Sequence, residues 1–184
     1  LRPVKGLELK VLGAIRYVKT GREHRNHDNS NSAEAYRAAY VRYTRENNKL
    51  LYDDPDQPGY PAKVVIPLGG FYNRNENTLL NYYQRSTFNY NTSFNEGLHT
   101  LNVMGGQEIR STDRLDTWNR GVGIQWDRGG VPFLGIDYFK QLIENNGGYY
   151  GMSEKYDRFV AFFVTAGYSY KGTYILNATG RYDG

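Results

Sequence analysis

Acidic side chains cluster in one Pro-rich stretch of the chain. Asp53, Asp54 and Asp56 lie close together, and carboxylate oxygens are the ligands that calcium prefers in proteins. The ligand spacing and the closing Glu of an EF-hand are both absent. A solvated turn explains these acids better than a calcium site does, so we predict no metal here.

A second group of possible metal ligands lies earlier in the chain. His24 and His27 are three residues apart, beside Glu23 and Asp28. Zinc sites with two histidines on one helix use a different pattern that includes a catalytic Glu, and the chain has no Cys to complete a structural site. We interpret this segment as a polar loop without a metal.

Aromatic and charged residues alternate in a later stretch. Aromatic faces beside charged groups suit the binding of sugars or peptides, and they equally suit packing within a loop. Both interpretations stay open. The predicted substrate-binding residues are Trp118, Trp126, Tyr149 and Tyr150.

Catalysis is not indicated. No nucleophile elbow or triad-like order is present, and the many carboxylates do not single out a glycosidase pair. The net charge of +4 is spread along the chain, so nucleic acid is not a predicted partner. We predict a protein that is not an enzyme and has no cofactor.

The composition favours a different class of protein. Aromatic residues make up 15% of the chain, with 18 Tyr among them. Tyr combines an apolar ring with a hydroxyl that stays hydrated, which suits the boundary between water and lipid. The sequence holds no apolar run of about 18 residues, so a transmembrane helix is not predicted.

Period-two alternation predicts five β-strands, because successive side chains of a strand point to opposite faces. These patterns persist for about 10–15 residues, while strands of soluble domains usually have about 5–6 and an outer-membrane strand needs about 9–11. The predicted strands are residues 7–19, 80–94, 98–110, 158–170 and 174–183.

The connections alternate between short and long. Residues 95–97 and 171–173 predict tight hairpin turns with a Gly in each, whereas 20–79 and 111–157 are long. This rhythm is typical of barrels with short periplasmic turns and long extracellular loops. Residues 31–45 predict one loop helix, with Asn31 and Glu34 spaced as a capping box and Tyr36, Ala39, Tyr40 and Tyr43 on one face.

The energy of charge in a bilayer assigns the two faces. An Arg or Lys facing lipid at mid-membrane costs about 2–4 kcal/mol, so the parity that carries the arginines should face the lumen. Lys19 and Arg158 have the lipid parity, and we expect them at strand ends, where they reach the headgroups. The predicted lumen-facing residues are Arg16, Arg85, Asn89, Asn177 and Arg181, and the predicted lipid-facing girdle is Tyr17, Tyr82, Phe94, Tyr168, Tyr170, Tyr174 and Tyr182.

Three segments resemble strands of SusC/RagA-family TonB-dependent transporters. Residues 3–10, with Pro-Val-Lys-Gly-Leu, resemble a strand entry of that family, and residues 98–108, Leu-His-Thr-Leu-Asn-Val-Met-Gly-Gly-Gln-Glu, resemble a second strand. The most specific is 174–184, Tyr-Ile-Leu-Asn-Ala-Thr-Gly-Arg-Tyr-Asp-Gly. Their order matches a continuous section of such a barrel.

The resemblance implies an all-β fold, namely a fragment of a large antiparallel transmembrane β-barrel in the bacterial outer membrane. Residues 1–184 would be part of one barrel domain, with the plug domain and the remaining strands elsewhere. The family imports oligosaccharides or peptides, with a SusD-like surface lipoprotein over the mouth and energy from TonB–ExbB–ExbD through regions missing here. Both ends look cut, which also favours a fragment.

Two other functions remain as alternatives. One is a soluble all-β carbohydrate-binding or hydrolase module, which the aromatics and acids favour. The other is a non-transporting outer-membrane barrel, such as an adhesin or an assembly scaffold, which would share every strand-level feature. The family-like segments favour the transporter over both.

Overall fold

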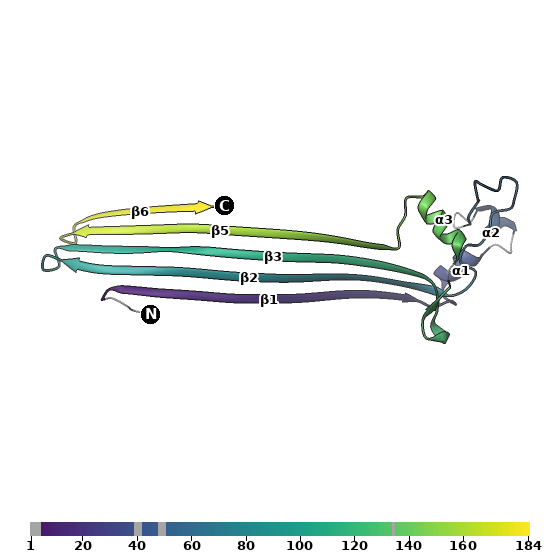
Figure 1. Ribbon diagram of the computed structural model, residues 1–184, viewed down its shortest axis with the longest axis horizontal. Helices are drawn as coiled ribbons and strands as arrows, with labels where there is room; N and C mark the ends of the chain where they lie inside the picture. The colour runs from purple at the N-terminus through teal and green to yellow at the C-terminus, as the bar shows by residue number, and fades with distance from the viewer. Residues whose placement is uncertain (1–4, 39–41, 48–50, 134) are drawn as a thin grey trace. The chain divides into compact units, whose positions relative to one another are not determined.

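The computed structural model describes residues 5–38, 42–47, 51–133 and 135–184. The long strands lie in the order β1-β2-β3-β5-β6 (Figure 1). The short β4 pairs with β3, so that the sheet has six described strands. Among the described residues no helix has the length and apolar character needed to cross a membrane. The strands are β1 Leu7–Asn26, β2 Gly70–Phe94, β3 His99–Gln125, β4 Val131–Pro132, β5 Tyr150–Tyr170 and β6 Tyr174–Asp183.

The five predicted strands are confirmed, and β6 has the predicted bounds. The other four are longer than predicted, because residues 20–26, 70–79, 111–125 and 150–157 were assigned to loops. In these extensions successive side chains still point to opposite faces, but few of them are apolar, as in Tyr72-Asn73-Arg74-Asn75. Backbone hydrogen bonds to a neighbouring strand hold such a segment without an apolar face.

Both predicted hairpin turns are confirmed. In the first, Asn95, Glu96 and Gly97 all have positive φ, and the Leu98 amide donates to the Asn95 carbonyl over 3.0 Å. Leu98 therefore belongs to the turn and not to the strand. In the second, Lys171 and Gly172 have positive φ, which suits the twist of a tight hairpin.

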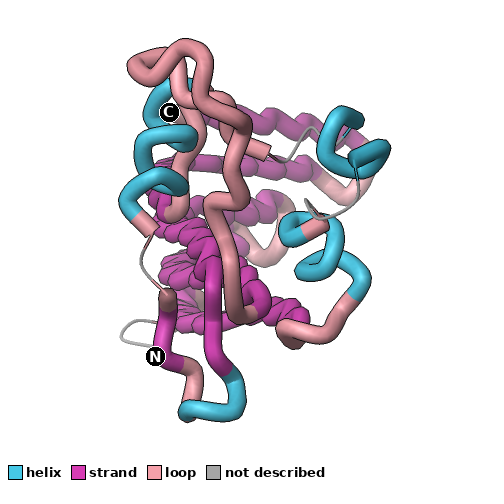
Figure 2. The backbone as a smooth tube through the Cα atoms, turned by 90° about the vertical axis from the view of Figure 1, so that its right-hand side faces the viewer, coloured by secondary structure: helices cyan, strands magenta, loops and turns pink. Residues whose placement is uncertain are grey.

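The long connections hold short helices (Figure 2). They are α1 Asn31–Arg37, α2 Arg42–Asn47, the 3-10 turn η1 Trp126–Arg128 and α3 Ile136–Glu144. The prediction of a single helix over 31–45 with Asn31 in a capping box is wrong. Ser30 is the N-cap, and its side chain accepts from the Ala33 amide over 3.3 Å. Ala39 and Tyr40, expected on one helix face, lie outside the described residues, and α3 was not predicted.

The chain divides into two compact units. We call the first the sheet unit, Leu1–Lys19, Thr78–Leu115 and Glu154–Gly184, and the second the loop unit, Thr20–Asn77 and Asp116–Ser153. That residues 1–184 belong to one barrel domain stays a prediction.

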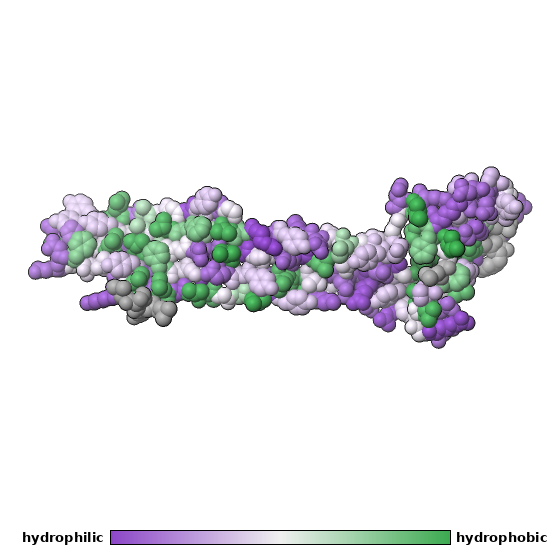
Figure 3. All heavy atoms as spheres, viewed as in Figure 1, coloured by the Kyte–Doolittle hydropathy of each residue, from purple (hydrophilic) through white to green (hydrophobic). Residues whose placement is uncertain are grey.

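The sheet unit has two chemically different faces. On one face, the Phe88 side chain occupies the space where a side chain at Gly105 would lie. On the opposite face, the side chains of Phe163 and Thr87 occupy the space where a side chain at Gly106 would lie. On the apolar face large hydrophobic side chains stay exposed, and Figure 3 shows hydrophobic residues gathered where β6 lies beside β5. The exposed residues with this parity are Leu9, Val11, Ile15, Tyr17, Tyr82, Phe88, Phe94, Ile109, Val160, Phe162, Val164, Tyr174, Leu176 and Tyr182.

The loop unit has a core of its own. Ile66 is 1% exposed, and it packs with Tyr52, Val65 and Tyr138. Three of these four residues come from the Pro-rich segment before β2 and one comes from α3, so residues far apart in the sequence form one cluster. Phe71, Val122, Phe139, Leu142 and Tyr36 pack against this core.

Candidate functional site

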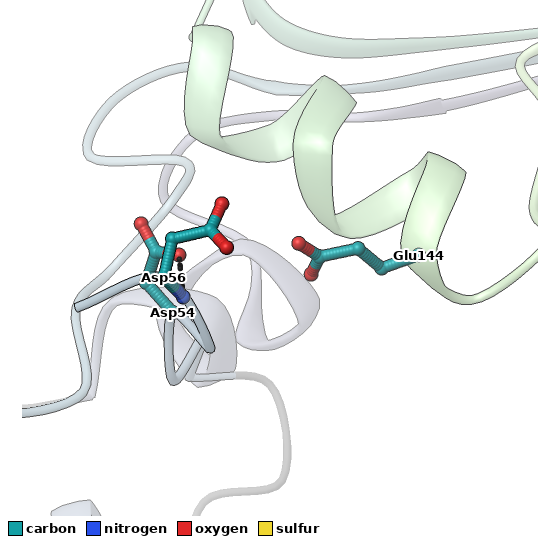
Figure 4. A group of neighbouring side chains, drawn as sticks. All are labelled: Asp54, Asp56 and Glu144. Carbon is teal, nitrogen blue, oxygen red and sulfur yellow. Dashed lines mark hydrogen bonds between the residues drawn. The ribbon is translucent and has the colours of Figure 1, made fainter. Parts of the chain in front are cut away.

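The acidic cluster of the loop unit is a structural contact. The carboxylates of Asp54, Asp56 and Glu144 lie near one another, with the first two on the Pro-rich segment and the third on α3 (Figure 4). The Lys140 ammonium lies 2.5 Å from a carboxylate oxygen of Asp54 and 2.5 Å from one of Asp56. Lys63 reaches Asp54 at 4.0 Å. The Lys140 ammonium thus lies where a metal cation would lie between the carboxylates of Asp54 and Asp56.

The titration of this cluster follows from its contacts. The hydrogen bond from Lys140 holds the pKa of the buried Asp54 carboxyl below its usual value. The hydrogen bonds of Lys140 to Asp54 and Asp56 in turn raise the pKa of Lys140. Burial, followed by the hydrogen bond to Glu144, raises the pKa of Tyr52 to about 12. The Tyr52 hydroxyl therefore stays protonated and donates to Glu144 over 2.8 Å. The cluster ties the Pro-rich segment to α3.

A polar cleft of about 500 Å³ opens beside the loop-unit core. Its apolar wall carries the rings of Tyr36, Phe71 and Tyr138, where Tyr36 and Phe71 lie 5.1 Å apart. Its polar wall comes from β1, α1, β2, β3 and α3 with its C-cap residue. An adjoining hollow of about 490 Å³ shares three of these residues. The polar lining is His24, Asn26, Ser32, Asn73, Arg120, Gln141 and Asn145, and the hollow adds Arg22, Glu23, Asn75 and Asn119.

Three of the four predicted substrate-binding aromatics lie next to this cleft. Trp118 is on β3, and the Arg120 guanidinium lies 5.1 Å above its ring. The Arg120 amide donates to the Tyr149 carbonyl over 2.7 Å, which brings Tyr149 and Tyr150 beside β3. Both tyrosines are about half exposed. Whether they touch a substrate stays a prediction.

The fourth aromatic lies elsewhere. Trp126 on η1 donates from its indole nitrogen to the Asn26 carbonyl over 2.9 Å, and it packs against Tyr72 at 6.0 Å. Arg25 lies over both rings. Because neighbouring strand residues point to opposite faces, Arg25 and Tyr72 face away from the cleft that Asn26 and Phe71 line.

The residues of the polar cleft were not predicted as a site. His24 was noticed as a possible metal ligand, and it lines the cleft with amides instead. It belongs to no group of possible metal ligands among the described residues. The signal was the polar alternation of Asn73, Asn75 and Asn77 with charged residues, which marks a strand with a hydrogen-bonding face. Gln141 and Asn145 join it through the fold of α3 alone.

The predicted lumen-facing residues share the polar face of the sheet unit. The Arg85 guanidinium lies 4.9 Å above the Phe163 ring, and Phe163 pairs with Arg181. Asn177 pairs with Gly167, and its side-chain oxygen fills the space where a Gly167 side chain would lie. Arg16 lines a hollow with Arg110 and Arg114, and Asn89 has the parity of Arg85. That this face meets a lumen stays a prediction.

The predicted girdle residues share the apolar face. Near the two hairpins, His99 stacks on Phe94 at 4.8 Å and hydrogen-bonds the Tyr168 hydroxyl at 2.6 Å. Tyr170 lies 5.0 Å from the same ring. His99 was not among the predicted girdle residues. Tyr17, Tyr82, Tyr174 and Tyr182 are exposed on this face.

Two charged residues do not lie where they were expected. Lys19 and Arg158 were predicted at strand ends, but both lie inside longer strands, β1 and β5. Arg158 forms an ion pair with Asp113 at 2.5 Å and donates to the Thr112 carbonyl over 3.2 Å. A partner on the neighbouring strand thus stabilises the charge of Arg158.

Comparison with known proteins yields similarity at the level of the fold. No protein-family model matches the sequence, and no curated protein matches it. The structure is similar to a chain in the structure of the RagAB peptide importer in the "closed-closed" state, with a TM-score of 0.63 and 16% identity, covering 100% of this chain and 16% of that one. It is also similar to a chain in the structure of the RagAB peptide transporter, with a TM-score of 0.58, 15% identity and the same coverage. This chain therefore has the fold of about one sixth of a chain from those transporter structures.

Proposed function

We propose that this chain forms wall and extracellular loops of a SusC-like, TonB-dependent transporter in the bacterial outer membrane. In this proposal the sheet unit crosses the bilayer, with its apolar face in lipid and its polar face in the lumen. The loop unit stands in the external solvent. The transporter takes up oligosaccharides or peptides together with a SusD-like lipoprotein, and it receives energy from TonB–ExbB–ExbD.

The one-sided sheet is the observation that carries the proposal. Val11 and Ile15 are 76% and 72% exposed on the apolar face, although burying such side chains is the main source of stability in water. On the polar face, Arg85 and Arg110 cover the rings of Phe163 and Phe159. A bilayer is the surrounding that solvates the first face without cost, and a hydrated lumen suits the second.

The similarity to the RagAB structures supports transport and a lipoprotein partner. Those structures are described as a peptide importer and a peptide transporter, which favours peptide over oligosaccharide as cargo. The two alternatives fit less well. A soluble carbohydrate-binding module would leave the apolar face of the sheet unit in water, and an adhesin would not need the resemblance to a transporter chain.

Cysteine labelling of the native polypeptide tests the orientation of the sheet, because residues 1–184 contain no Cys and the polypeptide without an introduced Cys serves as the blank. We expect Cys at Val11 and Val164 to resist a water-soluble maleimide, and to be quenched by nitroxide lipids when it carries a fluorophore. Cys at Asn89 and Asn177 on the polar face should escape quenching by lipid. Equal quenching at all four positions, or recovery of the protein in a soluble fraction, would contradict the proposal.

Transport itself needs a separate measurement. Cells that lack the polypeptide should lose uptake of its cargo, and a tagged polypeptide should co-purify with a surface lipoprotein from the outer membrane. Loss of uptake on removing the proton gradient would support energy coupling. An outer-membrane protein whose deletion changes cell adhesion and leaves uptake intact would instead favour the adhesin.

A further inference from the structure

We infer that the polar cleft of the loop unit is a binding site for a carboxylate, carried by a ligand that also offers hydrogen-bonding groups. This inference rests on the proposed function and deepens it, because it names a chemical class of cargo. Two kinds of cargo carry such a group, namely an acidic peptide and a sugar acid of the uronate type.

Arginines without a carboxylate partner are the first observation. Arg120 lies at the junction of the cleft and its adjoining hollow, and Arg22 lines that hollow. Neither forms an ion pair with any residue that the structure describes. Glu23 carries the carboxylate nearest in sequence to Arg22, and it forms an ion pair with Arg25 at 2.8 Å. The cleft therefore presents positive charge that no side chain described in the loop unit neutralises.

The position of Arg120 is fixed before any ligand arrives. Its guanidinium lies 5.1 Å above the Trp118 ring, a cation–π contact that leaves the edge of the guanidinium available. Trp118 is itself held against the chain at Gly151, where an added Cβ would lie 2.2 Å from the indole nitrogen. A planar guanidinium held in this way matches the two oxygens of a carboxylate, and little side-chain freedom is lost on binding.

The rest of the lining fits the remainder of such a ligand. Asn73 on β2 and Gln141 on α3 each carry one acceptor and two donors, as peptide groups and sugar hydroxyls require. On the other wall the rings of Tyr36 and Phe71 offer an apolar surface for a side chain or a sugar ring. The volume of about 500 Å³ is in the range of small-ligand sites.

The acids near the cleft are paired with cations. Glu23, which lines the adjoining hollow, is paired with Arg25 at 2.8 Å. Asp54 and Asp56 both form ion pairs with Lys140, which holds them against α3. Burial is the main cause that raises the pKa of Tyr138, so its hydroxyl stays uncharged at neutral pH. The ligand carboxylate thus meets arginines and amides.

Matched pairs of probes test the inference on the native polypeptide purified from the outer membrane. The first pair is a Gly/Ser/Asp hexapeptide with a free carboxyl terminus and the same peptide with Asn for Asp and an amidated end. The second pair is trigalacturonic acid and its methyl ester. Equilibrium dialysis gives the affinity of each. For one pair we expect the charged member to bind about tenfold more tightly, as charge-assisted hydrogen bonds allow.

Substitutions then assign the preference to Arg120. R120Q should remove most of the tenfold ratio, whereas R120K should keep part of it because the charge remains and the two-pronged geometry is lost. R128Q is the matched control, since Arg128 is an exposed Arg of the loop unit outside the cleft. Indole fluorescence, compared with that of the unsubstituted polypeptide, checks that each variant keeps its fold, and within residues 1–184 it reports Trp118 and Trp126.

The outcomes separate this inference from the proposed function. A preference in the peptide pair, or in the galacturonate pair, that R120Q removes supports the site and identifies its source of carboxylate. If the two members of each pair bind equally, or if neither binds, the inferred carboxylate site is overturned. A preference for the charged member that R120Q retains also overturns it. Membrane fractionation and uptake by cells test the transporter independently, so a transporter without this carboxylate preference refutes the site alone.

Discussion

The two units treat their hydrophobic residues in opposite ways. In the loop unit, Ile66 and Val65 are buried with Tyr52 and Tyr138, as in a small water-soluble domain. In the sheet unit, most of the exposed large hydrophobic side chains, such as Val164 and Tyr182, lie on one face, with Leu12, Met104 and Ile175 exposed on the other, and Ala161 is its only buried hydrophobic residue among those described. The difference teaches that the loop unit buries its hydrophobic residues within itself, whereas the sheet unit leaves most of its own exposed, as the proposed place in a bilayer would require.

Removing core volume from the loop unit should have the largest effect. Ile66 is the largest fully buried side chain that the structure describes, so I66A should destabilise the loop unit by about 2–5 kcal/mol. Hydrogen exchange of residues 51–70 measures this, and the strands of the sheet unit should keep their protection. The control I136A changes a side chain that is 85% exposed and should cost less than about 0.5 kcal/mol. Similar exchange in both variants would remove the distinction between core and surface.

A charge on the apolar face should break the sheet unit. V164R places a guanidinium where lipid is proposed and should cost about 2–4 kcal/mol, seen as loss of the heat-modifiable band in the outer membrane. Its control is T179R, on the polar face of the neighbouring strand, which should assemble normally. Normal assembly of V164R would mean that this face does not meet lipid.

Crowding Trp118 should disturb the loop unit more gently. An added methyl group in G151A meets the indole nitrogen, so Trp118 must move, at a cost of about 1–3 kcal/mol. Fluorescence quenching by acrylamide should increase. G21A adds the same methyl group in open space within the same unit, and unchanged quenching is expected there. Equal effects in the two variants would contradict a close contact of Gly151 with Trp118.

Acidification should loosen the loop unit and not the sheet unit. The pKa of Asp54 is lower in the folded chain than its usual value of 3.8, so its contribution to stability is present above that value and is lost as pH falls through the folded pKa. Hydrogen exchange at Tyr52 and Lys63 should therefore rise below about pH 4. D54N should remove this acid-dependent part. A response to acid that persists in D54N would point to other carboxylates.

The sequence predicted the strands more completely than it predicted the candidate site. Alternation located every long strand because side-chain parity is a local property, and β6 was predicted with its full bounds. The same rule missed 70–79 and 111–125, since polar residues on both faces give no hydrophobic signal there. Trp118 was selected for its residue type, and its role beside Arg120 depends on a neighbour two residues away on the same face.

What the sequence determined by itself was local: strand parity, the two turns with their glycines, and the separation of apolar from charged residues on the sheet. The tertiary structure decided which distant residues meet. Lys140 lies 86 residues from Asp54 and neutralises it, and α3 brings Gln141 to the cleft that Asn73 lines from β2. The physical reason is that strand periodicity acts over two residues, whereas the ion pairs, the core and the cleft of the loop unit join segments that only the folded chain brings together.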